Sequence, residues 1–99
     1  MNRNTKRLRA AEVRAAVASA GMFKALSDES RVKIILMLSS GETNACDLID
    51  ELNISQPTLS HHLSVLVQAK LVECSKDGKW RIYSLSDSGR AVAEFIQNG

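Results

Sequence analysis

Residues 53–71 carry a series of polar side chains that are almost uncharged. A solvated helix surface normally carries pairs of glutamate and lysine, whereas this segment offers hydroxyl, amide and imidazole groups. Such groups form hydrogen bonds with phosphates and with the edges of bases. An ordinary polar helix surface is the alternative, and this segment alone does not decide between them. The side chains concerned are Ser55, Gln56, Thr58, Ser60, His61 and Ser64.

A helix must position these groups, and its start is marked in the sequence. Ser55 is a favourable N-cap, and Pro57 stands in the first turn, where its missing N–H costs nothing. We expect this helix to run to about residue 69. Its other face is an apolar stripe that should contact the core, formed by Leu59, Leu63 and Leu66. A shorter helix is expected at 44–52, so the two make a helix-turn-helix, whose second helix enters the major groove of DNA.

The pattern changes from helical to strand-like after residue 71. Two short strands are expected at 72–76 and 79–85, joined through Asp77 and Gly78, a strong hairpin signal. A hairpin directly after a helix-turn-helix, with a basic tip, indicates a wing that contacts phosphates or the minor groove. An ordinary edge hairpin kept soluble by lysine is the alternative. The basic side chains at the tip are Lys76, Lys79 and Arg81.

Three further helices complete the expected fold. The helix at 8–26 is rich in alanine, and its apolar surface extends past one face, which indicates packing against a second copy of the chain. The helix at 27–39, capped by Ser27, is apolar nearly all round and should be central. The last helix begins at Ser86 or Asp87, ends near residue 97 and should pair with the first. One side of it is apolar: Ala91, Val92, Phe95 and Ile96.

The chain has 99 residues and a net charge of +2, which indicates one domain with a modest core. The expected fold is mainly α with a β-hairpin wing (α+β): four helices, two strands and a last helix. Basic residues are concentrated near the N-terminus, so residues 1–7 are expected to be a disordered basic arm and residues 8–98 the folded domain. No apolar run is long enough for a membrane span, and no signal peptide is recognisable, so we expect a soluble, cytoplasmic protein.

Four stretches resemble the ArsR/SmtB family of winged-helix repressors: 23–31 (FKALSDESR), 46–48 (CDL), 55–63 (SQPTLSHHL) and 78–83 (GKWRIY) with Leu85. They lie within about two-thirds of the chain, and the match at 55–63 is specific. The resemblance implies a homodimer, built on the first and last helices, that binds a pseudo-palindromic operator in double-stranded DNA and leaves it when an effector binds. It places groove and phosphate contacts at Ser55, Gln56, Thr58, Ser60 and His61, and wing contacts at Lys79 and Arg81.

The sequence departs from the family where many members hold a metal ion. Their Cys-x-Cys-Asp-Leu motif reads Asn44-Ala45-Cys46-Asp47-Leu48 here. One thiolate does not make a site for arsenite or a soft divalent ion, which require three or more ligands. The second family site needs histidine in the last helix, and residues 87–98 contain none. We therefore expect no complete metal site and no cofactor.

The sequence leaves alternatives open for the two cysteines. Cys46 is a remnant ligand, a redox thiol favoured by the helix dipole, or a small buried residue. Cys74, on the first strand, is interpreted as structural, but both cysteines are redox candidates and a disulfide between them is an open alternative. His62 lies beside the apolar stripe and is expected to be packed and bonded internally. Neighbouring helix positions do not face one another, so Ser60 with a histidine gives no catalytic arrangement and no enzyme is expected.

The effector is not identifiable from the sequence. One alternative function is a repressor that responds to a thiophilic metal or arsenic through Cys46 with ligands from the other subunit. Another is a winged-helix module that contacts proteins and does not bind DNA.

Overall fold

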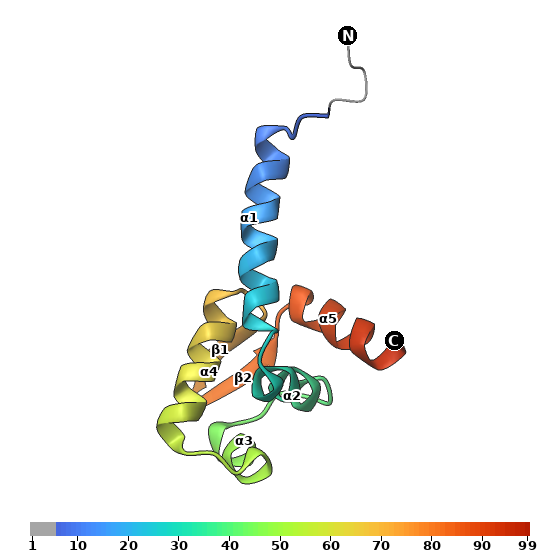
Figure 1. The fold of residues 1–99 in the computed structure, drawn as a ribbon. Coiled ribbons are helices and arrows are strands. Elements are labelled where there is room, and N and C mark those ends of the chain that lie inside the picture. Colours follow the sequence, from blue (N-terminus) through green and yellow to red (C-terminus); the bar gives the residue numbers. More distant parts are fainter. Residues whose placement is uncertain (1–5) are drawn as a thin grey trace.

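The computed structural model describes residues 6–99 of the chain (Figure 1). The predicted order of elements is confirmed, namely four helices, a two-stranded antiparallel hairpin and a last helix. Their bounds are α1 Ala10–Ala25, α2 Glu29–Leu38, α3 Ala45–Leu52, α4 Gln56–Gln68, β1 Val72–Asp77, β2 Trp80–Leu85 and α5 Asp87–Asn98. The predicted disorder of residues 1–7 concerns mainly residues 1–5, which lie outside the described residues. In the described part of the chain, no helix is both long and apolar enough to span a membrane.

Helix α2 lies at the centre of the body, as predicted. It contacts α3, α4, α5 and β2, and Ile34, Ile35 and Leu38 are buried within it. From α4 the leucines 59, 63 and 66 pack into the same core. Burying one such side chain contributes about 1.5–3 kcal/mol, so this cluster fixes α4 against α2.

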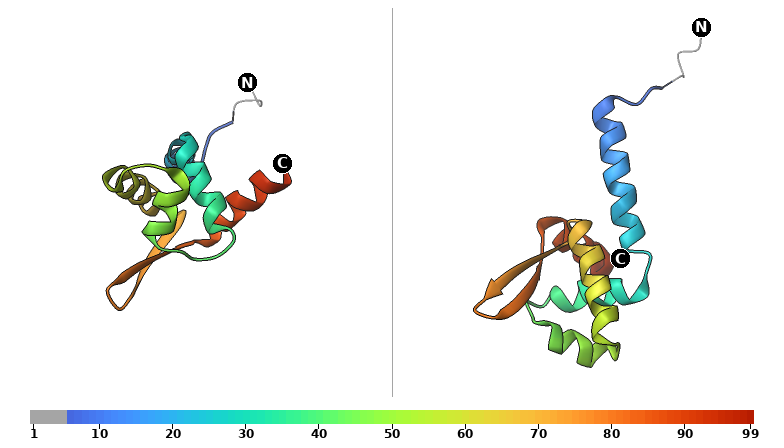
Figure 2. Two further views of the ribbon diagram at one scale, coloured as in Figure 1. Left: turned by 90° about the horizontal axis from the view of Figure 1, so that it is seen from below. Right: turned by 90° about the vertical axis from the view of Figure 1, so that its left-hand side faces the viewer.

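Helix α1 projects away from this body (Figures 1 and 2). Ala25, its last residue, is the one buried residue in it. The side chains of Val13, Val17 and Phe23 are 46%, 70% and 68% exposed. Met22 and Ala25 at the end of α1 pack against the core, whereas these three larger side chains are left mostly uncovered among residues 6–99.

The predicted cap of α4, Ser55, is confirmed, and the predicted cap of α2, Ser27, is wrong. The side chains of Asn44, Ser55 and Ser86 each accept a backbone N–H of the helix that follows. Helix α2 is capped by Asp28 rather than by Ser27. The Ser27 hydroxyl instead donates to the carbonyl of residue 24 at the end of α1, at 2.7 Å, so the next residue is left to cap α2.

The hairpin turn lies one residue later than predicted. Asp77 pairs with Trp80 across the strands, so the two turn residues are Gly78 and Lys79 rather than Asp77 and Gly78. Gly78 has a φ of +63°, in the left-handed region that glycine enters without penalty, at the first turn position. Lys79 thus belongs to the turn and not to the second strand.

Candidate nucleic-acid interface

Helix α4 has one buried apolar face and one exposed polar face, as the sequence indicated. Leu59, Leu63 and Leu66 are 1%, 3% and 0% exposed. All six polar residues predicted as DNA contacts on or next to this helix are exposed: Ser55, Gln56, Thr58, Ser60, His61 and Ser64. No charged side chain interrupts this face, so its donors and acceptors are available to a partner.

The turn between α3 and α4 is tight. Asn53 ends α3 with a φ of +53°, a left-handed conformation that asparagine tolerates better than most residues. Its N–H donates to the carbonyl of Ile49 at 2.8 Å. Two residues later, the Ser55 hydroxyl accepts the N–H of Thr58 at 3.3 Å and donates to the Thr58 hydroxyl at 2.8 Å. These bonds define the end of α3 and the start of α4.

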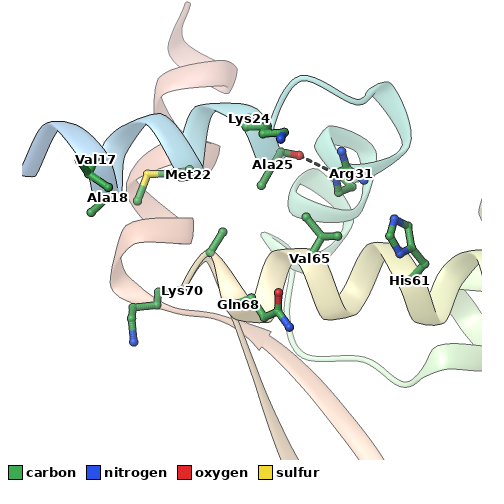
Figure 3. A pocket seen from close by; sticks show the side chains of 12 residues that line it. Val17, Ala18, Met22, Lys24, Ala25, Arg31, His61, Val65, Gln68 and Lys70 are labelled. Atoms are coloured by element: carbon green, nitrogen blue, oxygen red, sulfur yellow. Dashed lines mark hydrogen bonds between the residues drawn. The ribbon is translucent and has the colours of Figure 1, made fainter.

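The hairpin lies along one side of this polar face. Arg81 lines a hollow of about 330 Å³ together with Gln56 and Ser60, and a second of about 340 Å³ together with Ser60 and Ser64. The structure therefore brings Arg81 together with the α4 residues that lie on the hairpin side. His61 lies on the other side of α4, where it lines a groove of about 650 Å³ between α1 and α4 (Figure 3).

The remaining predicted wing residues lie further out on the hairpin. Lys76 is paired with Arg81 across the strands, and Lys79 stands in the turn. All three cations are exposed. Between residues 6 and 99 the single ion pair joins Lys33 and Glu29 on α2, so the charges of the wing are not neutralised within that part of the chain. Unpaired cations beside a polar helix are suited to phosphate contacts.

The comparisons with known proteins decide the family. Residues 28–73 match the model described as "Bacterial regulatory protein, arsR family". The arsenical resistance operon repressor of Staphylococcus aureus is 46% identical over 77 residues, which cover 78% of this chain and 72% of that protein. The chain belongs to the ArsR family. The transcriptional repressor SdpR of Bacillus subtilis (strain 168) is also similar, with 39% identity over 83 residues that cover 79% of this chain and 92% of SdpR.

A solved structure confirms the architecture. It is the homodimeric winged helix-turn-helix DNA-binding domain (fragment 1–100) of Mb0332 from Mycobacterium bovis, described as a possible ArsR-family transcriptional regulator. It has a TM-score of 0.80 and 21% identity, and the match covers 95% of this chain and 91% of that one. This ArsR-family chain is a DNA-binding transcriptional repressor whose effector is not specified by its relatives.

Both cysteines are free and exposed in this ArsR-family member. Cys46 is exposed and lines the hollow of about 330 Å³ together with Asn44 and Arg81, so the alternative that it is a small buried residue is wrong. Cys74 pairs with Tyr83 on the hairpin, and its exposure shows that it does not pack as a structural core residue. Within residues 6–99 no group of three histidine, cysteine or acidic side chains is arranged to hold a metal ion.

Tyr83 connects the hairpin to the start of α3. Its backbone forms a two-bond bridge with Thr43, at 2.8 and 3.1 Å, and its ring lines both hollows beside α4. Burial raises the pKa of Tyr83 above its usual value, and the neighbouring Cys74 thiol adds to this shift against the opposing charge of Arg81. The phenol is therefore neutral at ordinary pH and can act as a hydrogen-bond donor.

His62 is packed and bonded internally, as predicted, but its partner, Arg31, was not predicted. His62 is 8% exposed, and its Nδ1 lies 3.1 Å from Nη1 of Arg31 on α2. One signal for Arg31 was present in the sequence. An arginine in the first turn of a helix is opposed by the helix dipole, so its presence there calls for a compensating contact.

Proposed function

We propose that this chain acts as a homodimer that binds a pseudo-palindromic operator and represses transcription by occupying it. The observation that carries the proposal is the exposed, uncharged polar face of α4, which lies beside Arg81 of the wing. Hydroxyl, amide and imidazole groups on such a helix read base edges, while the wing cations bind phosphates. The proposed groove contacts are Ser55, Gln56, Thr58, Ser60, His61 and Ser64, and the proposed wing contacts are Lys76, Lys79 and Arg81.

The exposed apolar surface of α1 and α5 supports the homodimer. Val17 and Phe23 on α1 and Phe95 on α5 are 70%, 68% and 77% exposed. Monomeric proteins seldom leave several large apolar side chains uncovered on neighbouring helices. The mycobacterial domain of the same fold is homodimeric. A twofold axis through α1 and α5 would set the two α4 helices in successive major grooves, about 34 Å apart.

The signal that releases the operator is proposed not to be a metal ion held within one chain. Cys46 is an exposed thiol at the start of α3, and in the described part of the chain it has no second and third ligand nearby. A thiol-based signal fits this arrangement. The second candidate is thiophilic metal or arsenic sensing through Cys46 with ligands from the partner subunit, which is favoured by the likeness to an arsenical resistance operon repressor.

Fluorescence anisotropy with a duplex from the promoter region of the chain's own gene tests the DNA-binding proposal. Binding should be at least about 10³-fold tighter than to an unrelated duplex of equal length, and it should weaken steeply with salt. Changing Thr58→Ala together with His61→Ala should remove most of this selectivity. Arg81→Ala should weaken both duplexes about equally and reduce the salt slope by about one.

A matched control is available on the body of the domain. Lys33 is an exposed cation on α2 that is already paired with Glu29 at 3.1 Å, so Lys33→Ala should leave selectivity and salt slope unchanged. If the chain were instead a protein-interaction module that does not bind DNA, Thr58→Ala with His61→Ala would leave its function unchanged. Absence of salt-sensitive, selective binding by the wild-type chain would overturn the proposed function.

A further inference from the structure

One arginine joins three helices next to the DNA-reading face. Arg31 belongs to α2, and its Nε donates to the carbonyl of Ala25, the last residue of α1, at 2.6 Å (Figure 3). Its Nη1 lies 3.1 Å from Nδ1 of His62 on α4. The same residue's backbone N–H is accepted by Asp28, the cap of α2, at 3.2 Å. A single side chain thus connects the end of α1 to the recognition helix.

The chemistry of this contact has a fixed direction. A guanidinium only donates hydrogen bonds, so Nδ1 of His62 must accept, and the neutral ring carries its proton on Nε2. His62 is 8% exposed and follows directly after His61, whose ring centroid lies 5.9 Å away on the exposed face. This half-buried bond therefore acts on the helix turn that presents a proposed base contact.

The placement of Arg31 is not explained by α2 itself. A cation in the first turn of a helix is disfavoured by the helix dipole. The guanidinium is instead directed to the C-terminal end of α1, where the last carbonyls lack helical partners and a positive charge is favourable. Arg31 therefore stabilises the end of α1 and the side of α4, although its charge is unfavourable at the start of α2.

The contact between Arg31 and His62 is placed where it restrains rotation of α4 about its own axis. The leucine stripe holds α4 against the core along one line, whereas His62 lies to the side of that line. Side-chain tips lie about 5–6 Å from a helix axis, so a rotation of about 10° moves them by about 1 Å. A displacement of that size is enough to spoil hydrogen bonds to base edges.

We infer that Arg31 is a positioning residue for DNA reading, which sets the rotation of the recognition helix relative to α1 through its bond to His62. The inference rests on the proposed function. In the proposed dimer α1 belongs to the interface, so this bridge connects the subunit contact to the reading face within each protomer. Removing the bridge should lower operator affinity much more than non-specific affinity.

Two substitutions at His62 separate positioning from packing. His62→Asn keeps an acceptor at the position of Nδ1 but removes buried volume, whereas His62→Phe keeps the volume and removes the acceptor. Positioning predicts that the Asn variant binds operator better than the Phe variant although it unfolds more easily. If the contact only stabilised the fold, the variant that unfolds more easily would also bind the operator more weakly.

The experiment measures anisotropy of each full-length variant with the promoter duplex and with an unrelated duplex, alongside urea unfolding. Arg31→Lys retains the charge but cannot bridge both acceptors, so operator affinity should fall about tenfold, as for one lost base contact, with non-specific affinity unchanged. The Arg31→Lys/His62→Phe double variant should be no worse than the single variants.

Three results would overturn the inference. They are equal losses on both duplexes, additive losses in the double variant, or a Phe variant that binds operator better than the Asn variant. Lack of selective binding by the wild-type chain is a different result, because it refutes the proposed function itself.

Discussion

Removing the aromatic ring of Phe95 should weaken the proposed homodimer without harming the fold of the single chain. Phe95 lies on α5 and is 77% exposed, so it contributes little to the core of its own chain. The residues of α5 that are buried there are the small Gly89 and Ala93. Phe95→Ala therefore removes apolar surface that only a partner would cover.

The size of the effect follows from the exposed area. Burying a whole phenylalanine side chain contributes about 1.5–3 kcal/mol, and about three-quarters of the ring is available for burial. Because the change occurs twice in a symmetric dimer, the loss is about 2–4 kcal/mol. At about 1.4 kcal/mol for each tenfold, the dimer dissociation constant should rise by about 30-fold to 1,000-fold.

Sedimentation equilibrium measures this constant directly, and the chain offers a matched control. Trp80 is also a large exposed aromatic, 57% exposed, but it stands on β2 of the wing. Trp80→Ala should leave the dimer constant unchanged. An unchanged dissociation constant for Phe95→Ala would place the interface elsewhere. Equal increases for both variants would show that losing an exposed aromatic weakens the dimer by a route other than contact at α5.

Three further predictions concern the fold and the signal. A Cβ at buried Gly89 would meet the carbonyl oxygen of Leu71, so Gly89→Ala should lower the free energy of urea unfolding by about 1–3 kcal/mol, whereas exposed Ser88→Ala should change it by less than about 0.5 kcal/mol. For Asp28, burial raises the pKa, but hydrogen bonds from the backbones of residues 31 and 30 and nearby positive charge outweigh it, so the pKa is below its usual 3.8. A carboxyl group whose pKa is lowered in the folded state stabilises the fold fully above pH 3.8 and loses this contribution as the pH falls further. The free energy of unfolding should therefore fall less steeply with acid for Asp28→Asn than for the wild-type chain, and Asp87→Asn is the control. Titration of the reduced protein with cadmium or arsenite should show no tight stoichiometric binding, and tight binding that is lost in Cys46→Ser but kept in Cys74→Ser would establish the metal-responsive alternative.

The recognition helix was predictable because its signals lie close together in the sequence. The Ser55 cap, the proline in the first turn and the leucine spacing are all local, and the structure confirms each of them. Boundaries were predicted less accurately where two neighbouring residues could each have formed the cap or the turn. Ser27 and Asp28 are both good caps, and Gly78 fits either position of a two-residue turn, so both boundaries shifted by one residue.

Contacts between distant segments were not predictable from the sequence. Arg31 and His62 lie 31 positions apart, and the pattern of each helix alone does not show that they meet. Likewise, the hairpin pattern indicates a basic tip but not that Arg81 borders the same hollow as Ser60 and Ser64. Such contacts depend on how helices rotate as they pack, which is determined by side-chain volumes across the whole core.

Helix α1 shows why the single chain does not complete its own structure. It has 16 residues, and isolated helices of about that length are marginal in water even when rich in alanine. Only its last turn is held by the body, through buried Ala25 and the bond that this residue's carbonyl accepts from Arg31. The preceding turns carry Val13 and Val17, whose side chains are 46% and 70% exposed. In the proposed homodimer a partner would cover these turns, so subunit association should also stabilise helix α1.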